Sequence, residues 1–112
     1  MTLAAWYLHD IGRLAKIVSR EFGALPYERF ANDAKKIESA AMKLMIMKEG
    51  WAWLPRKIRQ ELVPIDWRAI IGKWDRDSGR RVGINPKKLW DTIVQRLPEM
   101  SRSVEEALKN SG

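Results

Sequence analysis

The chain has 112 residues, of which 21 are Lys or Arg and 14 are Asp or Glu, giving a formal net charge of +7. This length fits one domain, spanning residues 1–112, and a hydrophobic content of 46% supports a buried core rather than a disordered tail. The absence of cysteine excludes disulfide scaffolds, thiolate zinc sites and cysteine nucleophiles, and one histidine, His9, excludes sites that need two, so we expect neither a metal nor a cofactor.

The N-terminal segment, MTLAAWYLHD, lacks a basic region and reaches Asp10 too early for a signal peptide. No apolar run in the chain approaches the ~20 residues of a membrane span. The sequence therefore predicts a cytoplasmic protein without a membrane partner.

The first predicted helix has an apolar residue at every third or fourth position and ends near Gly23, which suits the left-handed conformation common after a helix. Its apolar stripe consists of Leu3, Tyr7, Ile11, Leu14, Val18 and Phe22. Leu25 and Pro26 then begin a turn or a short helical piece that continues to Phe30.

A second long helix is predicted from the stripe Ile37, Ala40, Leu44, Met47, Trp51 and Leu54. Trp51 and Trp53 point about 200° apart on a helix, so they cannot both pack against one neighbour, and we expect one of them to contact a partner chain. Pro55 either ends this helix or begins an extra turn that contains Ile58 and Leu62.

Asp66 is a suitable N-cap for the next helix, because its carboxylate accepts from an unpaired backbone N–H. The apolar face of that helix is predicted to consist of Trp67, Ile70, Ile71 and Trp74. Residues 75–83, DRDSGRRVG, have little apolar periodicity and are predicted to form a broken helix end and a loop. No segment alternates convincingly with the period of a strand.

The last predicted helix begins with Asn85 as N-cap and Pro86 at the first helical position. Its stripe is Leu89, Ile93, Leu97, Met100, Val104 and Leu108, and Pro98 is expected to kink the helix or divide it. These elements predict an all-α, up-and-down bundle of four or five helices. The predicted core contains Ile11, Leu14, Leu44, Met47, Ile70, Ile71, Ile93 and Leu97.

Few residues have the chemistry of a catalytic site. His9 is interpreted as a partly buried structural residue, because Asp10 points about 100° away from it on a helix. Asp75 and Asp77 lie among cations and fit a solvated loop of mixed charge better than a magnesium pair. Gly72, Gly79 and Gly83 do not fit a phosphate-binding loop.

A basic segment is the clearest binding feature, since residues 73–88 contain six cations and two anions. The six candidate RNA-binding residues are Lys73, Arg76, Arg80, Arg81, Lys87 and Lys88. Beside an exposed tryptophan, they would hold an RNA strand through phosphate contacts and base stacking. The alternative is that a basic protein simply carries its cations on loops, and the residues alone leave both interpretations open.

Residues 44–76, LMIMKEGWAWLPRKIRQELVPIDWRAIIGKWDR, resemble the HepT-like branch of the HEPN superfamily. The most specific blocks are Trp-Arg-x-Ile-Ile-Gly at 67–72 and Leu-Trp-Asp-Thr at 89–92. The other positions that match are Leu8, Asp10, Ile11, Phe30, Asp33, Leu44, Ile46, Met47, Glu49, Ile65, Asp66, Gly83, Asn85, Ile93, Leu97 and Pro98. The resemblance covers nearly the whole chain.

This resemblance implies a HEPN-like bundle that dimerises around a shared cleft, and a metal-independent ribonuclease toxin encoded beside a minimal nucleotidyltransferase antitoxin. The family's catalytic motif is Arg, four residues, His, one residue, Tyr, and it falls here on Trp74, Gly79 and Arg81. All three residues are replaced, and Gly79 offers no proton acceptor.

Three hypotheses follow, in this order. The first is a catalytically degenerate HepT-like protein that dimerises and binds the nucleotidyltransferase. The second is an active ribonuclease with a relocated site, such as Arg76, Arg80 and Asp77 across a dimer cleft. The third is a non-catalytic, basic RNA-binding module without an antitoxin partner.

Overall fold

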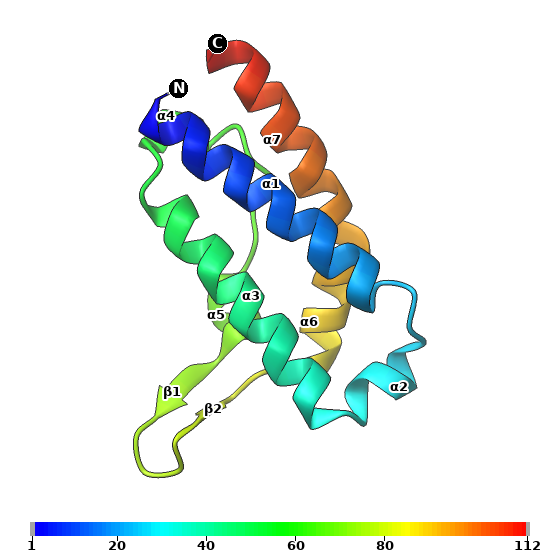
Figure 1. Ribbon diagram of the computed structural model, residues 1–112. Helices are drawn as coiled ribbons and strands as arrows, with labels where there is room; N and C mark the ends of the chain where they lie inside the picture. Colours follow the sequence, from blue (N-terminus) through cyan, green and yellow to red (C-terminus); the bar gives the residue numbers. More distant parts are fainter. Residues whose placement is uncertain (1, 112) are drawn as a thin grey trace.

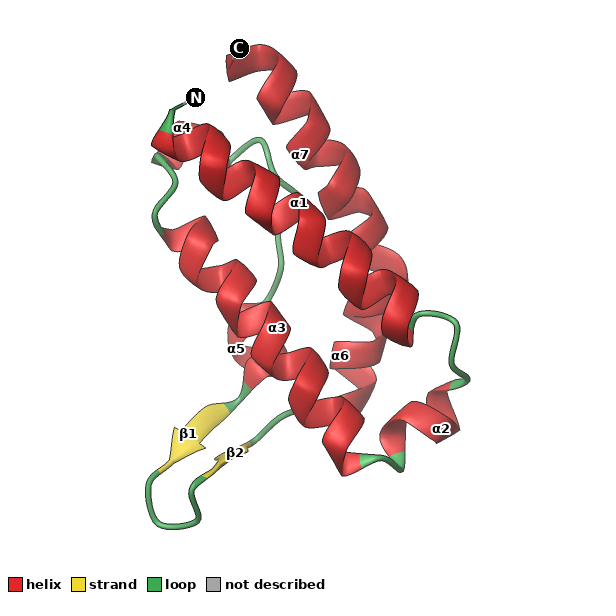
Figure 2. Ribbon diagram, in the orientation of Figure 1, coloured by secondary structure: helices red, strands yellow, loops and turns green. Residues whose placement is uncertain are grey.

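The computed structural model describes residues 2–111, and helices make up most of it (Figure 1 and Figure 2). The longest helices are α1 (Leu3–Phe22), α3 (Ala34–Ala52) and α7 (Leu97–Ser111). The short helices are α2 (Tyr27–Ala31), α4 (Arg56–Arg59), α5 (Trp67–Ile71) and α6 (Pro86–Asp91). Helix α1 packs against both α3 and α7, so the prediction of an all-α helical bundle is confirmed.

The apolar faces predicted from the sequence form the core. All eight predicted core residues are buried, namely Ile11, Leu14, Leu44, Met47, Ile70, Ile71, Ile93 and Leu97. The first stripe is wrong only at its start, where Leu3 is 67% exposed and Leu8 is fully buried. Within residues 2–111, no helix has the length and apolar character needed to cross a membrane.

The helix ends follow the predicted caps with one exception. The carboxylate of Asp66 accepts from the Ala69 N–H at 3.4 Å, and the side-chain oxygen of Asn85 accepts from the Lys88 N–H at 3.0 Å. The prediction for Gly23 is wrong, because it keeps a right-handed conformation, with φ −67°. Its N–H donates to the Ser19 carbonyl at 2.9 Å, which continues the hydrogen-bonding pattern of α1 by one residue.

The segment predicted to be a broken helix end and loop is instead a β-hairpin. Strand β1 (Lys73–Asp75) pairs antiparallel with β2 (Arg80–Val82), and Figure 1 shows the hairpin projecting beyond the helices. Strands of only three residues offer too few positions for an alternating pattern to be recognised.

The apolar face predicted for α5 is wrong at Trp74. Helix α5 ends at Ile71 because Gly72 has φ 64° and ψ −157°, a backbone conformation that only glycine adopts easily. Trp74 therefore lies on β1 and is 59% exposed, whereas Trp67, Ile70 and Ile71 are buried as predicted.

Pro98 does not divide the last helix. The chain is helical from α6 through η1 (Thr92–Arg96), a π-helical turn, into α7, whose second residue is Pro98. Proline lacks the N–H that a regular helix needs at this position. The wider hydrogen-bonding pattern of η1 directly precedes it, so the helix passes the proline with a local change of pitch.

Candidate functional site

The three positions that the resemblance assigns to the catalytic motif all lie on the hairpin. Trp74 and Arg81 are directly opposite each other on β1 and β2, and Gly79 lies in the turn with φ 66°. None of the three side chains can accept a proton from an RNA hydroxyl at neutral pH. The three motif positions therefore lie together on the hairpin, but the residues that occupy them cannot perform acid–base catalysis.

Arg81 holds the base of the hairpin against the helices. Its Nε donates to the Ile71 carbonyl at 2.7 Å and its Nη2 donates to the Gly72 carbonyl at 3.4 Å. Its Nη1 lies 3.1 Å from the sulfur of Met45 on α3. Because carbonyl groups at the end of a helix lack partners within the helix, an arginine that binds them stabilises this end of α5.

The remaining cations of the hairpin differ in their surroundings. Arg76 is exposed in the turn, and Lys73 is exposed on β1. Arg80 forms an ion pair with Glu38 of α3, with 3.4 Å between Nη2 and Oε1. Arg76, Asp77 and Arg80, which the relocated-site hypothesis requires, are all exposed on or beside the hairpin turn.

The Asp75 carboxylate supports the hairpin turn. Its carboxylate accepts from the Ser78 N–H at 3.1 Å. Hydrogen bonding from Ser78, its side chain first and then its backbone, holds the pKa of the Asp75 carboxyl below its ordinary range. In the part of the chain that the structure describes, no group of three His, Cys, Asp or Glu residues is arranged to hold a metal ion.

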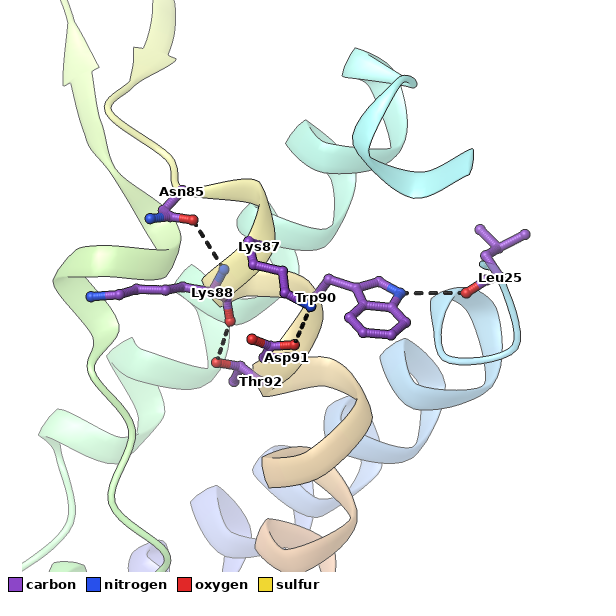
Figure 3. Close-up of polar contacts among 7 residues, drawn as sticks. All are labelled: Leu25, Asn85, Lys87, Lys88, Trp90, Asp91 and Thr92. Atoms are coloured by element: carbon purple, nitrogen blue, oxygen red, sulfur yellow. Dashed lines mark hydrogen bonds and ion pairs between the residues drawn. The ribbon is translucent and has the colours of Figure 1, made fainter. Parts of the chain in front are cut away.

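The two lysines of α6 point to different sides of that helix (Figure 3). Lys87 pairs with Asp91 at 3.2 Å, and its ammonium lies 4.9 Å from the ring centroids of both Tyr27 and Trp90. Trp90 Nε1 donates to the Leu25 carbonyl at 3.4 Å, which fastens α6 to the segment before α2. Lys87 is thus engaged in holding the fold together.

Lys88 extends from α6 away from Trp90 (Figure 3) and lines a cavity of about 370 Å³. Asp66, Asp91 and Arg96 line the same cavity, so its charges are mixed. The structure therefore divides the six predicted RNA-binding cations into two groups, four on or beside the hairpin strands and two on α6.

Sequence reasoning missed a third group of cations. Lys48 of α3, Arg68 of α5 and Lys73 of β1 together line a cavity of about 430 Å³. Only Lys73 belongs to the basic segment that the sequence indicates. The other two precede it by 25 and 5 residues, and no spacing rule connects them, because the fold of the hairpin against α3 and α5 brings them together.

The sequence also led to predictions about the burial of His9 and about the environments of Trp51 and Trp53. The interpretation of His9 as partly buried is wrong, because it is exposed on α1, and Asp10 pairs instead with Arg13 at 2.7 Å. Trp51 packs against Trp67 with 6.1 Å between ring centroids, whereas Trp53 is 72% exposed. The two side chains do occupy different environments, and contact of Trp53 with a partner stays a prediction.

With this geometry established, comparison with known proteins shows similarity over nearly the whole chain. A protein of Caldanaerobacter subterraneus named "Putative RNase" is 25% identical over 103 residues, which are 92% of both chains. Two proteins of Methanocaldococcus jannaschii with the same kind of name are 21% and 24% identical, over 93% of this chain and 86% and 90% of their own. No protein-family model and no solved structure matches the chain.

Proposed function

We propose that this chain is a HepT-like, HEPN-type relative of ribonucleases that has lost the cleavage reaction. In this proposal it acts in a toxin–antitoxin pair, by dimerising and by binding a minimal nucleotidyltransferase. Two findings support the ribonuclease-like part. The chain is similar over more than nine-tenths of its length to proteins named "Putative RNase", and it is a helical bundle.

The observation that carries the loss of cleavage is the chemistry of the motif positions. Gly79 has no side chain, Trp74 is an exposed indole, and the Arg81 guanidinium is bound to the Ile71 and Gly72 carbonyls. Hydrolysis of RNA by acid–base catalysis needs a group that accepts a proton within hydrogen-bonding distance of the attacking oxygen. Phosphate binding by the other arginines does not replace that group.

A cleavage assay tests this loss. A labelled RNA mixture is incubated with the wild type, with the double variant Trp74→Arg, Gly79→His, and with Arg80→Ala. We expect no cleavage by the wild type and at most partial activity in the double variant, because a histidine at a φ of 66° is strained and the surrounding loop is unchanged.

The opposite outcome would favour the relocated active site. Wild-type turnover that persists with a metal chelator and that Arg80→Ala abolishes would contradict the proposal. Such a result would favour an active site at Arg76, Asp77 and Arg80 on the hairpin.

The partner is tested by the neighbouring gene and by co-purification. We expect an adjacent reading frame with a Gly-Ser and Asp-x-Asp nucleotidyltransferase signature, and a stable complex when both proteins are expressed together. We also expect no nucleotide transfer to position 81, because arginine stands where the motif has its tyrosine. Absence of a complex with that neighbour would leave the RNA-binding module as the better hypothesis.

A further inference from the structure

The cavity between α3, α5 and the hairpin is lined by cations and by no carboxylate. Lys48, Arg68 and Lys73 come from three different elements, and the remaining lining residues are Ile71, Gly72, Val82 and Gly83. The volume of about 430 Å³ lies within the range of small-ligand sites.

These three cations are not neutralised by the chain itself. Within residues 2–111, none of the three forms an ion pair, whereas Lys43, Arg80 and Lys87 each pair with a carboxylate. Like charges that converge on a concave surface without counterions reinforce one another's potential and attract anions. The three cations of this cavity therefore have no anionic partner among its lining residues and can bind an anionic ligand.

The strand register explains why the cavity exists. Lys73 and Val82 are paired across β1 and β2, so their side chains lie on the same face of the hairpin and both line the cavity. Gly72 allows the chain to turn sharply out of α5, and a Cβ at this position would collide with the Val82 carbonyl oxygen. Arg81 fixes this arrangement from the opposite face of the hairpin.

We propose that this cavity binds the phosphate groups of a single-stranded RNA. Phosphodiester oxygens are the acceptors that lysine and arginine donors bind best. The choice of RNA rests on the ribonuclease-like part of the proposed function, but neither cleavage nor the nucleotidyltransferase partner is needed for binding. The loss of cleavage and the nucleotidyltransferase partner can therefore each be disproved without affecting this proposal.

A second cationic hollow provides a comparison within the same molecule. Lys16, Arg20 and Arg102 line a hollow of about 290 Å³ between α1 and α7. Here Lys16 pairs with Glu105 at 3.5 Å, so part of the charge is already compensated. Arg20 and Arg102 of this hollow, together with the exposed Lys35 of α3, supply a matched control for the removal of charge.

The test measures binding of a fluorescein-labelled 20-nucleotide oligouridine by anisotropy over a series of KCl concentrations. The cavity variant carries Lys48→Gln, Arg68→Gln and Lys73→Gln. The control carries Lys35→Gln, Arg20→Gln and Arg102→Gln, three exposed cations without ion pairs in the described part of the chain. Lys35 lies about 20 Å from Lys48 along α3, and both variants lose the same net charge.

We expect the cavity variant to bind at least about tenfold more weakly at low salt, and its logarithmic salt slope to fall by about 2, as three lost phosphate contacts predict. The control should lose less than about threefold, since it changes only the long-range field. Equal losses in the two variants would overturn the proposal, and so would a wild type that binds no RNA.

Two further experiments, NMR chemical-shift mapping and competition with phosphate compounds, identify the ligand of the cavity. In ¹⁵N-labelled protein, the amides of Gly72 and Gly83, which line the cavity, should shift on adding the oligouridine, whereas that of Gly12, packed against Val104, should not. Inorganic phosphate or uridine monophosphate should displace the RNA only at millimolar concentration. Displacement by either at the concentration of the RNA itself would mean that the cavity takes a free phosphate compound, and would contradict the assignment to RNA.

Discussion

Arg81 shows how a residue that resembles a phosphate-binding cation serves the structure instead. Arg81 is half-buried, and its Nε and Nη2 donate to the carbonyls of Ile71, the last residue of α5, and of Gly72, which follows it. Its neighbour Arg80 is exposed and pairs with Glu38 on the surface. The sequence offers no means of separating these two adjacent arginines, because the difference depends on which face of the hairpin each side chain occupies.

Replacement of Arg81 is expected to destabilise the protein, whereas replacement of Arg80 is not. Arg81→Ala leaves the Ile71 and Gly72 carbonyls without their partner and should cost about 1.5–3 kcal/mol of unfolding free energy. Arg80→Ala removes an exposed pair and should change that free energy by less than about 0.5 kcal/mol. Urea denaturation of both variants measures the difference, and equal values would contradict the structural role of Arg81.

Two glycines with positive φ angles give a second residue-scale prediction. Gly72→Ala forces a Cβ against the Val82 carbonyl in a conformation that only glycine adopts easily, and should cost about 3 kcal/mol or more. At Gly79 the same change meets no described atom within 4 Å and should cost about 1–2 kcal/mol through φ alone. Thermal melts of the two variants should differ accordingly, and a Gly79 variant that melts lower would refute the prediction.

The Asp75 carboxyl gives a prediction about pH. Because hydrogen bonds from Ser78 lower its pKa in the folded protein, its contribution to stability is fully present above the ordinary aspartate value of ~3.9. That contribution is lost as the pH falls through the lower, folded value. The ¹³C signal of this carboxyl should titrate below pH ~3.9, together with the Ser78 amide. A midpoint at or above that value, or a Ser78 amide that titrates unchanged in Asp75→Ala, would show that the contact is absent.

The helices, the hairpin and the cavity differ in how well they could be predicted from the local sequence. The long helices, the Asp66 and Asn85 caps and the eight core residues were predicted correctly because 3.6-residue periodicity and capping are local signals. The hairpin was missed because Trp74 continues the i, i+3, i+4, i+7 spacing of α5 while Gly72 has already ended the helix. The binding cavity was missed for another reason: Lys48 and Arg68 join Lys73 only through tertiary contacts.

Helix α5 is anchored by its apolar face, so a charge there should unfold the region. Ile71 is 4% exposed, and Ile71→Asp buries an uncompensated carboxylate at a cost of several kcal/mol. Ile17→Asp on α1 is the control, because Ile17 is 36% exposed and a carboxylate there remains in water. Circular dichroism melts compare the two, and an Ile71 variant that melts like the parent would mean that this face is wrongly assigned.

At the scale of the whole molecule, the cationic cavity and the exposed apolar side chains of α3 consist of different residues. The cavity is lined by Lys48, Arg68 and Lys73. The exposed side chains Met42 and Ile46 lie on the face of α3 opposite its buried residues, and the exposed Trp53 directly follows the last residue of that helix. An RNA strand and a second protein chain therefore require different groups of residues. Substitutions in the cationic cavity can therefore be tested for RNA binding, and substitutions at the apolar side chains for dimerisation, without changing residues of the other surface.

A homodimer is the final prediction, and it rests on the HepT-like resemblance together with this apolar face. Met42, Ile46 and Trp53 are 46%, 42% and 72% exposed, a larger apolar stripe than an unpartnered helix needs. Light scattering at ~100 μM should give twice the 13.0 kDa of one chain, and the double variant Ile46→Glu, Trp53→Glu should give one chain, because a symmetric interface would bury two copies of each new charge. The control variant Trp74→Glu, which adds a charge at a 59% exposed tryptophan of the hairpin, should remain dimeric. A wild type that scatters as a clean monomer would contradict the predicted dimer. Dissociation caused by Trp74→Glu alone would show that the interface lies at the hairpin and not at the apolar face of α3.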